Sequence, residues 1–385
     1  MKTIVQLFFG YAPIGTEGGM EKVFVELSNL AVEKNYKVIS ICNSNNADEK
    51  PFFPLDEKVE FHNLGLGKIK VPFYKKIIRE IAKIFHLNIE NYVDSHRAKI
   101  LAKHVDNILK DRDIYAVICY EINSVLVANV MENKAPKIAM AHGYVEVVIK
   151  PLSKWQLEEI NKMNAYQVLM PNFISEAKKY LDAKIVYIPN IVPLVNYSSV
   201  IKRQDDKKII INIGRIEPQK QQDILVKAFA KIANKDNWKM YFYGVVQDVK
   251  YKEEMERFIK YNNLSDKIFF KGVTSKPLEQ MQNADIFAFP SAHEGFPLAL
   301  SEAMSVGLPS IGFKNAHGIN GLIKNGENGF LCKDINDFTD KLEVLMKNEE
   351  LRNKMGVNAC KGMKQYSSDR VWKMWEELFE NLSIN

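Results

Sequence analysis

The chain has 385 residues, of which 46% are hydrophobic and 26% charged, and this composition is typical of a globular protein with two or three domains. Its net charge of +6 is small for this length and does not by itself indicate a nucleic-acid-binding protein. The four cysteines are widely separated and form no CxxC or Cys/His metal spacing, which predicts reduced, structural thiols in a cytosolic protein.

The first half of the sequence alternates short apolar runs with amphipathic stretches. The N-terminal run "TIVQLFF" predicts a buried strand rather than a signal peptide, because it is short and no small-residue cleavage pattern follows it. Further runs such as "KVISICN" and "YAVICY" are separated by helical patterns such as "MEKVFVELSNLAVEKN". This alternation predicts a parallel, doubly wound α/β sheet, and we assign it to a Rossmann-like domain over residues 1–195.

A glycine-rich loop joins the first predicted strand to the first predicted helix. Gly18 and Gly19 leave backbone N–H groups unobstructed at a helix N-terminus, which is a favourable place for an anion. The spacing is not GxGxxG, however, so the loop does not indicate a dinucleotide-dependent dehydrogenase.

Residues 74–86 predict a basic amphipathic helix. Between residues 68 and 110 there are ten Lys and Arg against four Asp and Glu, an excess that equals the net charge of the whole chain. Two interpretations stay open at this point. The helix lies on an anionic membrane surface, or it packs its apolar face on the core and leaves its basic face in water.

His142 follows the apolar run "KIAMA" and precedes a glycine. A histidine at the carboxyl end of a strand can donate a hydrogen bond to a ligand hydroxyl, although a lone histidine is more often structural.

The alternation of apolar runs and amphipathic stretches stops near residue 192. Residues 192–208 show no clear hydrophobic periodicity, which predicts a linker. The alternation of strands and helices then restarts, which predicts a second α/β domain over residues 206–366. Residues 367–385 predict a helix with a strong apolar stripe that includes two tryptophans. We expect this helix to pack back on the first domain.

Arg215 and Lys220 follow the first predicted strand of the second domain. Arginine offers a rigid fork of donors and lysine a point charge, so the two together can neutralise a diphosphate. A turn at Gly318 could receive a phosphate on its N–H groups, or it could be an ordinary turn.

Two glutamates stand in the run "SAHEGFPLALSEAM". We expect Glu294 in a loop after a strand and Glu302 in the second turn of a helix, since Pro297 suits the first helical turn. Ionised carboxylates at the carboxyl edge of a sheet can accept several hydrogen bonds from a polyhydroxylated ligand. The alternative is two glutamates exposed to water with no such role.

Together these pieces resemble glycosyltransferase family 4, which has the GT-B fold. The resemblance covers essentially the whole chain and rests on Glu294 and Glu302 separated by seven residues, on "GR" followed by Lys220, on "EGG" near the N-terminus, and on "IPN" before the linker. It implies two Rossmann-like domains facing a cleft, with the donor held mainly by the second. It also implies transfer with retention of anomeric configuration and no obligatory metal or cofactor.

The resemblance also assigns roles to individual residues. It implies that Arg215 and Lys220 bind the donor diphosphate, with Gly18 and Gly19 against it. It implies that Glu294 binds sugar hydroxyls and that Glu302 binds the ribose. The remaining assignments place His142 at the donor sugar, Gly272 and Val273 near the base, and Gly318 at a phosphate. Of these residues, Glu294 and His142 are our candidate catalytic residues.

One loop departs from the family pattern, because Asn320 and Gly321 stand where many members have a proline and a glutamate. The loop therefore gives no guide to the donor's base or sugar.

We expect a cytoplasmic, peripherally membrane-bound enzyme of the bacterial surface-polysaccharide type. It would transfer a hexose or N-acetylhexosamine from a nucleotide diphosphate donor, with UDP the expected nucleotide, to a lipid-linked or surface-glycan acceptor. No nucleic-acid partner is expected. The alternatives are a soluble glycosyltransferase making a small glycoside, and a nucleotide-sugar-binding module without turnover.

Overall fold

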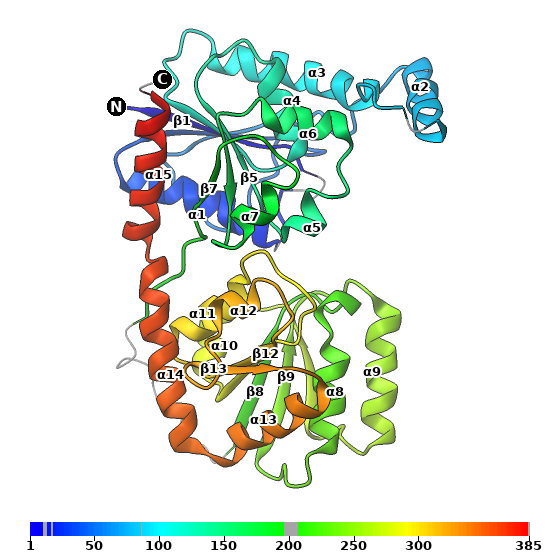
Figure 1. The fold of residues 1–385 in the computed structure, drawn as a ribbon, viewed down its shortest axis with the longest axis vertical. Coiled ribbons are helices and arrows are strands. Elements are labelled where there is room, and N and C mark those ends of the chain that lie inside the picture. Colours follow the sequence, from blue (N-terminus) through cyan, green and yellow to red (C-terminus); the bar gives the residue numbers. More distant parts are fainter. Residues whose placement is uncertain (11–13, 17, 86, 196–206, 384–385) are drawn as a thin grey trace. The chain divides into compact units, whose positions relative to one another are not determined.

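The chain forms two compact units, each built around one parallel β-sheet (Figure 1). The computed structural model describes residues 1–10, 14–16, 18–85, 87–195 and 207–383. The first unit comprises Met1–Ile191 with Ser368–Asn385, and the second comprises Val192–Ser367. Residues 196–206 of the predicted linker, Glu17 of the "EGG" motif, and His86 lie outside the described residues.

The first unit contains a seven-stranded sheet in the order β3-β2-β1-β4-β5-β6-β7, with every neighbouring pair parallel. The strands are β1 (Thr3–Phe8), β2 (Lys37–Cys42), β3 (Glu60–Asn63), β4 (Ala116–Cys119), β5 (Lys137–Met140), β6 (Ala165–Val168) and β7 (Ile185–Tyr187). The helices are α1 (Gly19–Glu33), α2 (Phe73–Ile84), α3 (Tyr92–Leu109), α4 (Ile122–Val130), α5 (Val145–Val148), α6 (Lys154–Asn161), α7 (Phe173–Ala177) and α15 (Ser368–Ser383).

The second unit contains a six-stranded parallel sheet in the order β10-β9-β8-β11-β12-β13. The strands are β8 (Lys208–Ile213), β9 (Trp238–Tyr243), β10 (Ile268–Gly272), β11 (Ile286–Ala288), β12 (Ser310–Phe313) and β13 (Gly329–Cys332). The helices are η2 (Pro218–Lys220), α8 (Gln222–Lys231), α9 (Val249–Tyr261), α10 (Pro277–Gln282), α11 (Leu298–Ser305), α12 (Ile319–Leu322), α13 (Ile335–Lys347), α14 (Glu349–Met363) and η3 (Lys364–Tyr366).

The strand order reverses at one point in each sheet, between β1 and β4 in the first unit and between β8 and β11 in the second. At such a switch point the loops leaving neighbouring strands diverge and open a crevice at the carboxyl edge, where open α/β sheets bind ligands. The predicted pair of doubly wound parallel sheets is therefore confirmed.

The central strands are buried on both faces, and Gln6 shows how a polar residue among them is paired. Gln6 of β1 donates from Nε2 to the Ser28 hydroxyl at 3.1 Å and accepts from the Tyr120 hydroxyl at 2.5 Å. Such pairing removes the cost of a buried polar group. All four cysteines are free and buried.

The C-terminal helix α15 packs on the first unit through its apolar stripe. Trp372 meets the ring of Tyr36 edge-on at 5.1 Å, and Phe379 meets the ring of Tyr115 at 6.0 Å. Lys34 and Asp369 form an ion pair beside these rings. The two tryptophans thus find the large apolar surface that their stripe requires.

Helix α2 does not pack its apolar face on the core, as one of the two interpretations predicted. None of its residues is buried, and Phe73, Tyr74, Ile77, Ile81 and Ile84 are exposed. The interpretation in which this face packs on the core is therefore wrong. No helix in the described residues combines the length and the apolar character needed to span a bilayer.

Candidate functional site

The loops that follow β8 and β11 meet at the switch point of the second sheet. The backbone N–H of Ala292 donates to the carbonyl of Gln219 at 3.0 Å, and Gln219 Nε2 donates to the carbonyl of His293 at 2.6 Å. These bonds fix the loop before α11 against η2. Two polar segments more than 70 residues apart in the sequence are therefore held together as one surface.

Lys220 and Glu294 form an ion pair on this surface. Lys220 Nζ lies 2.7 Å from Glu294 Oε1, and the two side chains are 14% and 15% exposed. The ammonium group also lies 5.9 Å from the centroid of the Phe289 ring. Because a carboxylate accepts several hydrogen bonds and an ammonium donates three, both groups keep capacity for a ligand.

Gly318 abuts the backbone of Glu294. It has a φ of +80°, and a Cβ built there would lie 2.6 Å from the Glu294 carbonyl oxygen. The Glu294 N–H also donates to the carbonyl of His317 at 2.9 Å. This close approach explains the glycine without any ligand, and the expected phosphate contact at Gly318 stays a prediction.

Glu302 lies in the second turn of α11 and is 5% exposed, whereas Glu294 lies in the preceding loop. This is the arrangement predicted from the sequence, except that Pro297 caps the helix instead of entering its first turn.

Arg215 stands at the carboxyl end of β8 with a more exposed side chain. Its guanidinium group lies 2.8 Å from Glu217 Oε1, and 56% of the side chain is accessible to solvent. The carbonyl of Arg215 accepts from Gln222 Nε2 at 2.8 Å, which ties this loop to the start of α8. The backbone of Arg215 is thus held in place, while the donors of its guanidinium group are accessible to solvent.

A cavity of about 660 Å³ lies beside α9 and the carboxyl ends of β9 and β10. Gly272 lines it, and so does Gly244, where a Cβ would lie 2.0 Å from the Gly214 carbonyl oxygen. Val273 follows and is exposed. Gly244 was not predicted from the sequence, since its need for glycine arises from its φ of +144° and from the backbone that follows β8.

Gly18 caps the N-terminus of α1 in the first unit, and Gly19 is the first helical residue. No side chain caps this end, and a Cβ on Gly18 would meet only the Thr16 hydroxyl oxygen, at 3.7 Å. Glu21 in the first turn is buried and accepts from the Thr16 N–H at 3.0 Å. Burial raises the pKa of its carboxyl group.

His142 follows β5 and is held in its neutral form. Burial lowers the pKa of its imidazole to about 3, and the ring stacks on Tyr120 at 5.2 Å. Its Nε2 atom is buried and has no hydrogen-bond partner among residues that the structure describes. An unpartnered ring nitrogen of this kind is suited to a ligand hydroxyl.

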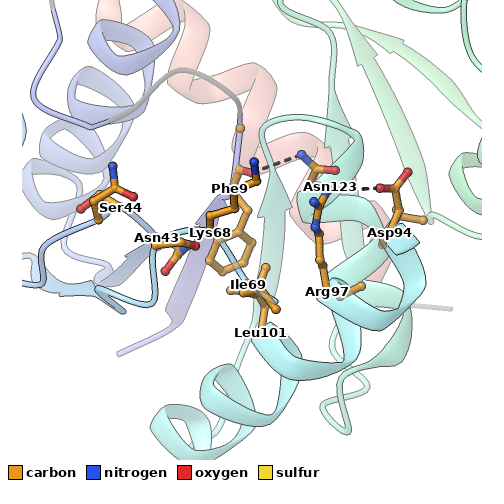
Figure 2. Close-up of a pocket in the computed structure, with 14 residues that line it drawn as sticks. Phe9, Asn43, Ser44, Lys68, Ile69, Asp94, Arg97, Leu101 and Asn123 are labelled. Carbon is orange, nitrogen blue, oxygen red and sulfur yellow. Dashed lines mark hydrogen bonds and ion pairs between the residues drawn. The ribbon is translucent and has the colours of Figure 1, made fainter. Parts of the chain in front are cut away.

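A second cavity, of about 380 Å³, lies at the carboxyl edge of the first sheet (Figure 2). Arg97 lies 3.7 Å from Asp94 on its wall, and burial raises the pKa of the Asp94 carboxyl group. Asn123 Nδ2 donates to the carbonyl of Phe9 at 3.3 Å, and Lys68 reaches the same cavity from the loop before α2. This site was not predicted from the sequence, where its only signal was the asparagine-rich "NSNN" directly after β2.

Comparison with known proteins assigns the chain to a class. The two parallel-sheet units define the GT-B fold, as in the crystal structure of a Staphylococcus aureus TarM mutant with fondaparinux, alpha-GlcNAc-glycerol and UDP. That structure has a TM-score of 0.73 and 18% identity, with 98% of this chain and 100% of that chain covered. Residues 196–362 match the family described as "Glycosyl transferases group 1".

Named relatives lead to the same class. The chain is 24% identical to the poly(ribitol-phosphate) alpha-N-acetylglucosaminyltransferase of S. aureus, over 89% of this chain and 67% of the relative. It is 32% identical to the UDP-Gal:alpha-D-GlcNAc-diphosphoundecaprenol alpha-1,3-galactosyltransferase of Escherichia coli, over 46% and 49% respectively. The chain is a GT-B glycosyltransferase, and hence a transferase enzyme.

Proposed function

We propose that this chain is a retaining family 4 glycosyltransferase that transfers a hexose or N-acetylhexosamine from a UDP-sugar to a lipid-linked or surface-glycan acceptor. The observation that carries the proposal is the Lys220–Glu294 pair at the switch point of the second sheet, with Arg215 at the same edge. No metal or other cofactor is part of the proposal.

The donor site combines cations for the leaving group with a carboxylate for the sugar. Arg215 and Lys220 bind the diphosphate, Glu294 accepts from sugar hydroxyls, and Glu302 accepts from the ribose. As the glycosyl–phosphate bond breaks, negative charge grows on the diphosphate, and fixed cations stabilise that charge. Lys220 then shares its three donors between Glu294 and the phosphate oxygens.

Other predicted residues complete the donor site in this proposal. In this proposal Gly272 and Val273 lie near the base and Gly318 near a phosphate, and Gly18 and Gly19 at the open N-terminus of α1 stay predicted ligands of the diphosphate. A helix N-terminus favours an anion because its first N–H groups are unpaired.

The proposed transfer occurs on one face of the sugar. The bond between the anomeric carbon and the diphosphate oxygen breaks, and the acceptor hydroxyl oxygen bonds to the same face of that carbon. The hydroxyl proton passes to the leaving diphosphate. His142 stays the predicted partner of the donor sugar, and its neutral imidazole can hydrogen-bond a sugar hydroxyl through Nε2.

We place the acceptor in the 380 Å³ cavity of the first unit. Lys68 and Arg97 supply positive charge there, and asparagine side chains supply donors and acceptors for hydroxyls. The names of two relatives contain phosphate-bearing acceptors, a poly(ribitol-phosphate) and a diphosphoundecaprenol-linked sugar. We therefore propose an acceptor with a phosphate group, reached at the cytoplasmic face of a membrane.

A screen of nucleotide sugars tests the donor proposal. Calorimetry on the full chain should show binding of UDP and of at least one UDP-hexose or UDP-N-acetylhexosamine, with slow release of UDP from that donor. Glu294→Ala should slow the release while UDP affinity is largely kept. Binding without any release would indicate a module without turnover, and absence of UDP binding would reject the proposal.

A further inference from the structure

Helix α2 carries its apolar face toward solvent. Phe73, Ile77, Ile81 and Ile84 recur at three- and four-residue spacing, and their exposed fractions run from 43% to 76%. The apolar surface continues beyond the helix through Phe85, Leu87 and Ile89, which are exposed as well. Figure 1 shows α2 at the outer end of the first unit, away from its sheet.

The side of α2 that faces α3 is half-buried and carries Lys75, Ile78, Arg79 and Ala82. Lys75 Nζ lies 3.2 Å from His96 Nδ1 on α3, and the positive charges of Arg79 and Lys83 act on the Asp94 carboxylate of the same helix. A surface helix normally buries its apolar stripe against the core. In α2 the stripe of Phe73, Ile77, Ile81 and Ile84 stays exposed instead, so the described chain itself supplies no cover for it.

The charge around this face selects the kind of partner. Residues 68–90 contain six Lys and Arg against two Glu, and Lys68, Lys70, Lys76 and Lys83 are exposed. An apolar stripe beside basic side chains is the pattern of a helix that lies in the headgroup region of an anionic bilayer. With 12 residues, α2 is too short to span one.

We propose that α2, with Phe85, Leu87 and Ile89, is a membrane-docking surface that inserts into the interface of an anionic lipid bilayer. The apolar side chains enter the acyl boundary, and the lysines contact lipid phosphates. The biological use of this surface rests on the proposed function, since a lipid-linked acceptor lies in the same membrane.

The docking surface adjoins the cavity assigned to the acceptor. Lys68 and Ile69, in the segment that leads into α2, line that cavity, and Asp94 of α3 does so as well (Figure 2). A bilayer bound at α2 would therefore bring lipid headgroups close to Lys68 and Arg97.

Vesicle sedimentation with the full chain tests the inference. The vesicles contain phosphatidylcholine alone, or phosphatidylcholine with about one third phosphatidylglycerol. We expect the wild type to bind the anionic vesicles. The double variant Ile77→Ser/Ile81→Ser should bind them at least about tenfold more weakly, and the double variant Lys76→Glu/Lys83→Glu about tenfold more weakly. High salt should weaken the wild type, because screening removes the charge contribution.

A matched control tests whether any exposed apolar pair gives the same effect. Val249 and Tyr261, at the two ends of α9, are 60% and 87% exposed. Val249→Ser with Tyr261→Ser should bind vesicles as the wild type does. Equal loss in this control, or no loss in the α2 variants, would overturn the proposal.

Two further measurements separate the competing outcomes. If light scattering shows a dimer that Ile77→Ser with Ile81→Ser dissociates, the face belongs to a second copy of the chain and the membrane proposal is wrong. UDP affinity should be unchanged in every α2 variant. A wild type that binds anionic vesicles but not UDP would refute the donor proposal and leave this inference standing.

Discussion

The ion pair between Lys220 and Glu294 is the residue-scale feature on which donor binding depends. Both side chains are mostly buried, so each compensates the charge of the other. Removal of the lysine leaves a carboxylate without its cation beside the proposed phosphate site, which adds repulsion to the lost contact.

Lys220→Ala should therefore weaken UDP binding by about 10- to 100-fold, which corresponds to about 1.5–3 kcal/mol for a charge-assisted contact. Titration calorimetry measures this directly. Lys227→Ala is the control, since Lys227 pairs with Asp223 at 2.7 Å on the exposed face of α8 and should leave UDP affinity unchanged. Equal UDP affinity in the wild type and Lys220→Ala would remove the lysine from the donor site.

Alanine substitutions at Gly318 and Gly326 separate the energetic cost of a positive φ from the cost of a steric clash. Both have a φ of +80°, but nothing lies within 4 Å of a Cβ at Gly326, whereas at Gly318 the Glu294 carbonyl oxygen lies 2.6 Å away. Gly326→Ala should cost about 1–2 kcal/mol of unfolding free energy from its φ alone. Gly318→Ala should cost about 1–3 kcal/mol more and slow UDP release by displacing Glu294.

Urea denaturation and the donor-hydrolysis assay measure the two effects. Equal destabilisation by both alanines would mean that the loop after β12 adapts and does not hold Glu294 in place.

His142 should make the stability of the chain depend on pH. Its imidazole has a pKa of about 3 when folded and about 6.5 when unfolded, so the unfolded chain binds the extra proton between these values. Stability should consequently fall as pH falls from about 6.5 toward 3, by up to about 1.4 kcal/mol per pH unit.

Unfolding free energies measured between about pH 7 and pH 5 in the wild type and in His142→Asn isolate this contribution. The asparagine variant should show the shallower slope. Parallel slopes would contradict the burial of a neutral imidazole at this position.

At the scale of elements, α15 and α2 show how similar sequence patterns receive opposite environments. Both are amphipathic, but α15 buries its stripe against Tyr36 and Tyr115, whereas α2 exposes its own. The stripe of α15 contains two tryptophans and a phenylalanine, and an aromatic surface is present for them in the first unit.

Trp372→Ala should therefore lower the free energy of unfolding by about 3–5 kcal/mol, because it leaves a cavity among packed rings. Lys373→Ala, on the exposed side of the same helix, should change it by less than about 0.5 kcal/mol. Urea denaturation followed by circular dichroism compares them. A small effect of Trp372→Ala would mean that α15 contributes little to the stability of the first unit.

At the scale of the whole molecule, the sequence predicted the two parallel sheets, because strands buried on both faces need continuous apolar runs and crossover helices need periodic ones. It also predicted the placement of Glu294 in a loop and Glu302 in a helix. The identity of the ion pair was not legible, since Lys220 and Glu294 come from loops whose meeting depends on the pairing of β8 with β11.

The sequence by itself determined the class of fold, the periodic faces of α2 and α15, and the residue types available at the strand ends. Only the tertiary structure decided which face of α2 meets water, why Gly244 and Gly318 must be glycine, and that five separate segments enclose the 380 Å³ cavity. The physical reason is that periodicity is a local property of the chain. Contact between distant segments depends instead on strand order and on close packing, which no short stretch encodes.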